Sequence, residues 1–144
     1  MMKSPLEAWH DVVKTGDVKI LDKILAKDVV FFSPIVFKPQ EGKAITKAYL
    51  TAAFKTFEGT GFHYVKELVE EREAILEFNT EIDGVMIDGV DIITWNEQGK
   101  ITEFKVMVRP FRAIEKVGEK MKEQLSKLGT MDKLKLGASK LFGK

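Results

Sequence analysis

The spacing of apolar residues changes along this chain from a helical period to strict alternation. In the first third, apolar side chains recur every three or four positions, as they do on one face of a helix. Gly16 is a permissive stop for the first helix, and Asp17 can cap the second. The pattern predicts three helices, which lie between Ser4 and Gly16, between Asp17 and Leu25, and over Lys43–Phe57.

Alternation of apolar and polar residues then predicts a set of strands. A short strand at Val29–Phe32 precedes the third helix, and four more follow it at Phe62–Val69, Glu73–Ile82, Met86–Asn96 and Ile101–Val108. The links between these four are short, which favours an antiparallel meander. One face of the second is mostly apolar, through Ala74, Leu76, Phe78, Thr80 and Ile82. Helices and sheet thus segregate as an α+β fold.

A final amphipathic helix is predicted after Pro110. Its apolar positions are Ile114, Val117, Met121, Leu125 and Leu128. We place one domain at residues 1–125 and a basic amphipathic tail at 126–144. The tail contains five lysines and one aspartate. The composition of the tail fits either a loosely docked segment or a helix on a membrane surface.

Composition narrows the function classes. With 44% hydrophobic and 31% charged residues, the chain matches soluble globular domains, and a cytoplasmic protein is the default expectation. Without cysteine there is no disulfide, thiolate metal site or cysteine nucleophile. The net charge of +1 owes its sign to the tail, so the first 125 residues offer no broad basic surface and nucleic acid is not an expected partner.

Asp91 is the most informative residue, because it stands in the apolar run Gly89-Val90-Asp91-Ile92-Ile93. A carboxylate is costly to desolvate in such a strand. Burial would raise its pKa and make it a pocket acid that donates a proton. The other interpretation is a structural acceptor of hydrogen bonds within the sheet.

Two histidines are the other candidates for proton transfer near neutral pH, namely His10 and His63. The direction of His63 depends on the register of its strand. The cluster Glu70, Glu71 and Glu73 has no histidine to complete a metal set and is interpreted as a solvated corner. No glycine-rich segment lies between a strand and a helix, as a phosphate-binding loop requires. We therefore expect neither metal nor cofactor.

The order of elements resembles that of the nuclear transport factor 2-like superfamily, with its SnoaL-like branch nearest. The resemblance covers about Leu6 to Pro110 and rests on these segments: Gly16-Asp17 between two helices, Leu25 to Pro34, Glu41-Gly42-Lys43 at the start of the third helix, Glu81 to Gly84, Gly89-Val90-Asp91 and Gly99 to Phe104. It implies a cone-shaped, strongly curved, mostly antiparallel sheet wrapped around three N-terminal helices, with an additional C-terminal helix. It also implies an apolar cavity and a homodimer through the outer face of the sheet.

Ketosteroid isomerases share this architecture and hold an aspartic acid neutral in an apolar site. Their oxyanion-binding aspartate corresponds to Asp91. Their general-base aspartate precedes a proline, where this chain has Ser33 before Pro34, and their tyrosine of the first helix corresponds to Trp9. An indole donates one hydrogen bond but is no phenolic acid. A base would then have to be His10, His63 or water.

Two hypotheses follow. In the first, a small hydrophobic molecule binds in the cone, and Asp91 is the acid of a cofactor-independent isomerase or cyclase. In the second, the protein is a non-catalytic binding or dimerisation module. The residues expected to contact the ligand are Trp9, Tyr49, Phe54, Leu76, Phe78, Ile93, Phe104 and Val106.

Overall fold

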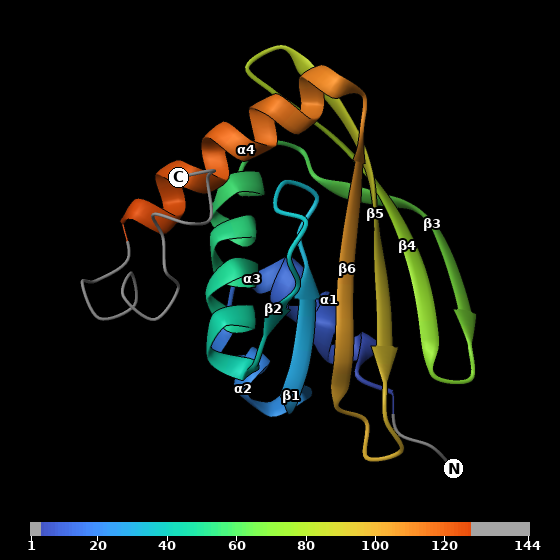
Figure 1. The fold of residues 1–144 in the computed structure, drawn as a ribbon. Helices are drawn as coiled ribbons and strands as arrows, with labels where there is room; N and C mark the ends of the chain where they lie inside the picture. Colours follow the sequence, from blue (N-terminus) through green and yellow to red (C-terminus); the bar gives the residue numbers. More distant parts are fainter. Residues whose placement is uncertain (1–3, 128–144) are drawn as a thin grey trace.

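A computed structural model describes residues 4–127 of the chain as four α-helices, one 3-10 turn and a six-stranded sheet (Figure 1). The elements in chain order are α1 (Leu6–Thr15), a 3-10 turn (Val18–Ile20), α2 (Leu21–Ile24), β1 (Leu25–Phe32), β2 (Gln40–Glu41), α3 (Lys43–Phe57), β3 (His63–Glu70), β4 (Glu73–Ile82), β5 (Val85–Trp95), β6 (Ile101–Arg109) and α4 (Phe111–Ser126). The predicted α+β class is confirmed.

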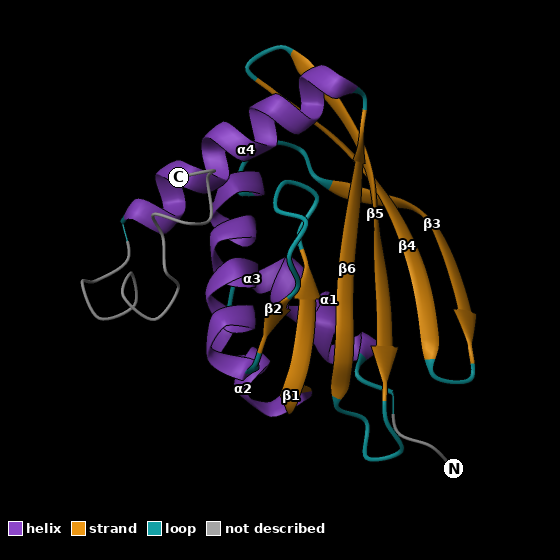
Figure 2. Cartoon of the chain, in the orientation of Figure 1, coloured by secondary structure: helices purple, strands orange, loops and turns teal. Residues whose placement is uncertain are grey.

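The strands lie in the order β2-β1-β6-β5-β4-β3. The pair β1 and β6 is parallel, and the other four pairs are antiparallel, so the predicted meander of β3 to β6 is confirmed. Figure 2 shows the sheet curving around the helices on one side, and α4 leaving the end of β6 to cross over α3. The cone expected from the resemblance is thus present, and its sheet is not closed.

The predicted second helix is shorter than the sequence pattern indicates. Leu21, Ile24 and Leu25 have helical spacing, but Leu25 already pairs with Ile101 as the first residue of β1. The register between β1 and β6 then shifts between Leu25 and Val30. This irregular start hides the alternation that marks a strand, so the sequence pattern places the beginning of β1 four residues late, at Val29.

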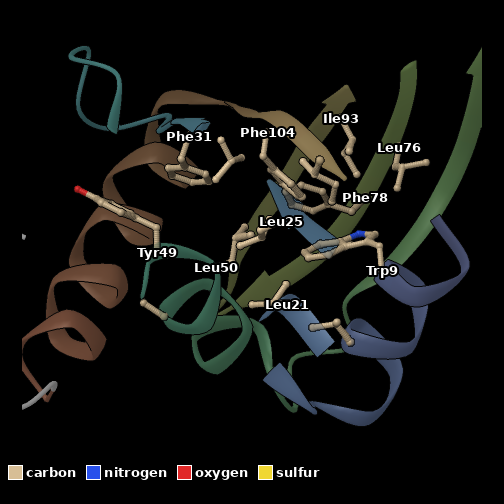
Figure 3. Close-up of a cluster of buried hydrophobic side chains, with 14 of the residues drawn as sticks. Trp9, Leu21, Leu25, Phe31, Tyr49, Leu50, Leu76, Phe78, Ile93 and Phe104 are labelled. Carbon is tan, nitrogen blue, oxygen red and sulfur yellow. The ribbon is translucent and has the colours of Figure 1, made fainter. Parts of the chain in front are cut away.

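The core fills the space between the inner face of the sheet and the helices. The strand β4 alternates as predicted, with Ala74, Leu76, Phe78, Thr80 and Ile82 buried. Figure 3 shows this core, in which side chains of α1, α3 and the strands meet. Its fully buried members include Phe31, Tyr49, Leu76, Phe78, Ile93 and Phe104.

Candidate functional site

Asp91 lies on the inner face of the sheet, in the middle of β5. It pairs with Leu76 of β4 on one side and with Val106 of β6 on the other. Its relative exposure is 5%, which is exceptional for a carboxyl group among apolar neighbours. The alternation of side chains along a strand explains this orientation, because Gly89, Asp91 and Ile93 all face inward while Val90 and Ile92 face outward.

A cavity of about 350 Å³ lies against Asp91. Its apolar wall comes from α1, α3 and the inner face of the sheet, through Trp9, Val12, Val13, Phe31, Leu50, Ala53, Phe54, Phe57, Phe62, Phe78, Phe104 and Val106. The exposed lining residues mark its rim, between the end of α1 and the loop from α3 to β3: Lys14, Thr15, Glu58, Gly59 and Gly61. Among the residues that the structure describes, Asp91 is the single carboxyl group in the buried part of this lining.

Asp91 ends a chain of two hydrogen bonds that begins on α1. The indole Nε1 of Trp9 donates to the hydroxyl oxygen of Tyr64 at 3.0 Å. That hydroxyl donates to Oδ2 of Asp91 at 2.6 Å, a short bond of the kind that charged acceptors make. Trp9 therefore holds Tyr64, and Tyr64 holds one oxygen of Asp91.

Burial dominates the acidity of both groups in this chain. Desolvation raises the pKa of Asp91 from 3.8 to about 7, and the hydrogen bond from Tyr64 opposes the rise. Desolvation, followed by the charge and hydrogen bond of Asp91, raises the pKa of Tyr64 well above 10. Near neutral pH, Asp91 is thus present in both its protonated and its ionised form, while Tyr64 remains a phenol.

Gly89, two residues before Asp91, makes room for an aromatic wall of the cavity. A Cβ at this position would overlap the ring of Phe78 and would lie 2.9 Å from the carbonyl oxygen of Met107. The ring of Phe78 can therefore lie across β5, where it stacks on Phe62 at 4.7 Å. Gly89 thus allows Phe78 to line the cavity beside Asp91.

Five of the eight predicted ligand-contact residues line the cavity: Trp9, Phe54, Phe78, Phe104 and Val106. Leu76 and Ile93 are fully buried and do not line it. Tyr49 stacks on Phe31 at 5.0 Å and does not line the main cavity. In Figure 3 its hydroxyl points away from Trp9, Phe78 and Phe104. The alternation of apolar residues identifies inward positions, but it does not distinguish a cavity wall from packed core.

The two histidines lie outside the lining. His10 is on α1, where its Nε2 lies 3.1 Å from Oε1 of Glu67 and its ring meets Tyr64 edge to face at 5.6 Å. His63 points to solvent at the start of β3, and its Nδ1 donates to the carbonyl oxygen of Gly61 at 2.8 Å. The register that the sequence left open is thus resolved, with His63 outward and Tyr64 inward.

Ser33 is separated from Asp91 and serves the turn after β1. Its Oγ accepts hydrogen bonds from the amides of Ile35 and Val36. Ser33 and Tyr49 both line a second, small cavity of about 30 Å³ between this turn, α3 and α4. The hydroxyl of Tyr49 is buried without a hydrogen-bond partner among the described residues.

Tyr64 is the site residue that the sequence pattern did not reveal. A bulge at Val65 sets the side chains of β3, since Tyr64 pairs with Phe78 but Lys66 pairs with Glu77. Before the bulge, the aromatic side chains of Phe62 and Tyr64 both point to the inner face of the sheet. The alternation of these two aromatic residues was the signal available in the sequence. It does not fix the direction of Tyr64, because a shift of register by one residue would turn the side chain outward.

The remaining expectations concern a metal site, membrane contact and the C-terminal tail. Within residues 4–127, no group of three or more histidine and acidic side chains could hold a metal ion. No helix in this range is long and apolar enough to cross a membrane. All but the first two residues of the predicted tail, 126–144, lie outside the described residues.

Comparisons with known proteins agree with this architecture. A steroid delta-isomerase from Pseudomonas aeruginosa is 31% identical, with a TM-score of 0.80 over 84% of this chain and 88% of that chain. A protein with a cystatin-like fold from Silicibacter pomeroyi is 29% identical, with a TM-score of 0.78 over 88% of this chain and 87% of that chain.

A more distant structure, the epoxide hydrolase/cyclase-like enzyme SalBIII of pyran ring formation in salinomycin, is 15% identical. Its TM-score is 0.58 over 72% of this chain and 87% of that chain, a similarity that concerns the fold alone. No curated protein sequence matches the chain. The family model described as a SnoaL-like domain matches residues 6–104, and the chain therefore belongs to the SnoaL-like family.

Proposed function

We propose that the cavity binds a small, neutral hydrophobic molecule and that Asp91 acts as an acid on an oxygen atom of that molecule. The observation that carries the proposal is a carboxyl group with a pKa of about 7 in the wall of an otherwise apolar cavity. An acid is most effective when its pKa lies near the working pH. The cavity volume of about 350 Å³ is within the usual range for small-molecule sites.

The chemistry that fits these groups is redox-neutral ring closure or isomerisation. Asp91 would give its proton to a carbonyl or epoxide oxygen while an internal nucleophile of the ligand attacks the activated carbon. The hydroxyl of that nucleophile would lose its proton to the ionised carboxylate, which restores the acid. One residue thus lends and regains a single proton, and no cofactor is required.

In the part of the lining that the structure describes, the absence of a second buried base favours ring closure over double-bond migration. Migration requires a base that removes a proton from carbon, and Ser33 stands where the ketosteroid isomerases have theirs. Besides Asp91, the titratable residues in the described lining are Lys14 and Glu58, both on the rim. An intramolecular closure supplies the returning proton from the ligand itself. The similarity to a steroid delta-isomerase, at 31% identity, supports a hydrophobic ligand.

The test is the pH dependence of binding for a matched pair of probes, 1-decalone and 1-decalol. The ketone oxygen only accepts hydrogen bonds, so it requires the protonated form of Asp91. Its affinity should be constant below pH 6 and fall about tenfold per pH unit above the pKa of Asp91. The alcohol both donates and accepts, so its affinity should change far less. Calorimetric titrations from pH 5.5 to 9 measure both curves.

Two variants control this experiment. Asp91→Asn should bind the ketone with the same affinity at every pH, because its amide is always a donor. Asp83→Asn, in the hairpin between β4 and β5, should keep the wild-type curve. A ketone affinity that stays flat to pH 9 in the wild type would contradict the proposal.

The alternative function is a binding module that holds the same ligand without turnover. It is favoured by the same absence of a second base in the described lining. The two functions share the binding curves above and differ in product formation. Mass spectrometry of the small molecule that co-purifies with the protein identifies the compound on which turnover is then measured.

We also infer that a second copy of the chain covers the outer face of the sheet. An apolar row runs across this face through Leu68, Ile75 and Ile92, which are paired neighbours on β3, β4 and β5. Leu68 is 59% and Ile75 is 39% exposed. Lys105 pairs with Ile92, and the pair Lys66 and Glu77 lies beside the row, so two copies related by a two-fold axis can match opposite charges.

Ile75→Glu is expected to separate such a dimer, because it would bury a charge in the centre of the interface. Light scattering after gel filtration should give the mass of two chains for the wild type and of one chain for the variant. Phe37→Glu is the matched control, since Phe37 is 99% exposed in the loop after β1. A monomeric wild type at micromolar concentration would overturn this inference.

A further inference from the structure

We infer that Trp9 and Tyr64 are positioning residues that fix the acidic proton of Asp91 on Oδ1, the oxygen left free for the ligand. This inference rests on the proposed function, because it specifies how the acid presents its proton. It assigns a role to Tyr64, which does not line the cavity, and a second role to the indole of Trp9, which does.

The direction of the two hydrogen bonds follows from the chemistry of the donors. An indole N–H can only donate, so the oxygen of Tyr64 must accept the bond from Trp9. A phenol has one proton, and the single other partner of this hydroxyl among the described residues is Oδ2 of Asp91. Tyr64 therefore donates to Oδ2, and Oδ2 is an acceptor.

A carboxylic acid carries its proton on one oxygen only. Oδ2 is occupied as an acceptor, so the proton of neutral Asp91 belongs on Oδ1. A proton on Oδ2 would have to be donated to Tyr64, and the proton of the phenol would then be buried without an acceptor. Oδ1 has no hydrogen-bond partner among the described residues. It is the oxygen through which Asp91 can meet a ligand in the cavity.

The aromatic packing keeps this chain of bonds from turning. The ring of Trp9 meets Phe104 edge to face at 4.8 Å. The ring of Tyr64 meets His10 edge to face at 5.6 Å and Phe62 edge to face at 5.3 Å. Each donor is thus held by a neighbour from another element. The indole in place of a tyrosine on α1 is consistent with a role in orienting Tyr64.

The inference also predicts which ligands are favoured at low pH. Oδ1 in the neutral acid offers a proton, so a ketone, ester or epoxide oxygen is a suitable partner. Loss of the positioning bonds would let the proton occupy either oxygen, so that the competent fraction of the acid falls about twofold or more. The ketone should then bind more weakly at pH 5.5, where Asp91 is protonated in every variant.

The experiment compares Tyr64→Phe and Trp9→Phe with Tyr49→Phe by carbon-13 NMR titration of the Asp91 carboxyl group, without ligand. Tyr64→Phe removes a bond that favours the carboxylate, so Asp91 should titrate at a higher pH than in the wild type. Trp9→Phe keeps an aromatic ring but removes the N–H donor, which leaves the hydroxyl oxygen of Tyr64 without this bond. It should weaken 1-decalone binding at pH 5.5 about twofold or more.

Tyr49→Phe is a matched control, because the hydroxyl of Tyr49 is buried without a partner among the described residues. It should leave both the titration of Asp91 and the ketone affinity unchanged. If Tyr64→Phe is folded and Asp91 titrates as in the wild type, the positioning role is wrong. If the titration moves but ketone binding in the wild type is independent of pH, the proposed function fails while the hydrogen-bond chain stands.

Discussion

Asparagine in place of Asp91 is expected to stabilise the protein increasingly as the pH rises from 4 to 8, by about 4 kcal/mol over that range. The pKa of this carboxyl is raised from 3.8 to about 7 in the folded protein, chiefly by burial. Between these values the unfolded chain releases the proton and the folded chain retains it. The free energy of unfolding of the wild type therefore falls with pH, by about 1.4 kcal/mol per unit. Asparagine has no such titration and keeps the shape of the side chain.

Urea unfolding of both proteins at several pH values measures the difference, in which contributions from other groups cancel. Asp83→Asn is the control of opposite sign. Hydrogen bonds and charge from Lys120 and Lys116 lower the pKa of Asp83, so this carboxylate stabilises the fold above its unfolded pKa. That variant should lose stability relative to the wild type as the pH rises through the acid range. A difference curve for Asp91→Asn that is flat between pH 4 and 8 would mean that Asp91 ionises freely.

Phe104→Ala is expected to cost about 3–5 kcal/mol of unfolding free energy, the usual range for a buried phenylalanine. Phe104 is 1% exposed, and its ring packs against Trp9 at 4.8 Å and Phe31 at 6.2 Å. The substitution therefore removes contacts from α1 and β1 together and enlarges the cavity. Urea unfolding at pH 6 measures the loss.

Phe111→Ala is the matched surface control, since Phe111 is 72% exposed at the start of α4 and should change stability by less than about 0.5 kcal/mol. Benzene should restore part of the lost stability of Phe104→Ala, because an apolar void accepts an apolar ligand that binds only the folded state. A cost below about 1 kcal/mol would contradict this prediction and would show that the neighbouring side chains relax into the space left by the Phe104 ring.

The stability deficit expected at Asp91 has a functional interpretation. A buried carboxyl that weakens the fold at neutral pH would be replaced by leucine or asparagine if stability alone mattered. Proteins tolerate such groups where activity requires them. The two interpretations from the sequence, pocket acid and structural acceptor, also prove compatible, since Oδ2 accepts a structural bond while Oδ1 remains free.

Much of the fold could be predicted because its signals are local and periodic. The alternation in β4 and β6, the helical face of α3 and the short turns between strands all carry their own pattern. The position of Asp91 followed from one charged residue in an apolar strand. Tyr64 was missed because its direction depends on a bulge at Val65, which is set by pairing with β4 rather than by the residues of β3.

The same limit explains why Tyr49 and Leu76 were predicted to contact the ligand but do not line the main cavity. Both lie on apolar faces, as predicted, but a period locates a face and gives no information about where packed side chains leave a space. Similarly, the early start of β1 depends on a pairing with Ile101, which is far away in the sequence. The missing information is in each case a contact between distant parts of the chain.

Four side chains, those of Phe31, Ala53, Phe57 and Val106, border both the hollow beside Asp91 and the small one beside Tyr49. These shared side chains form the boundary between the two hollows. Rotation of the Phe57 ring about its side-chain bonds would join the two chambers without any shift of the sheet. The longest guest that fits would then depend on the rotamer of Phe57.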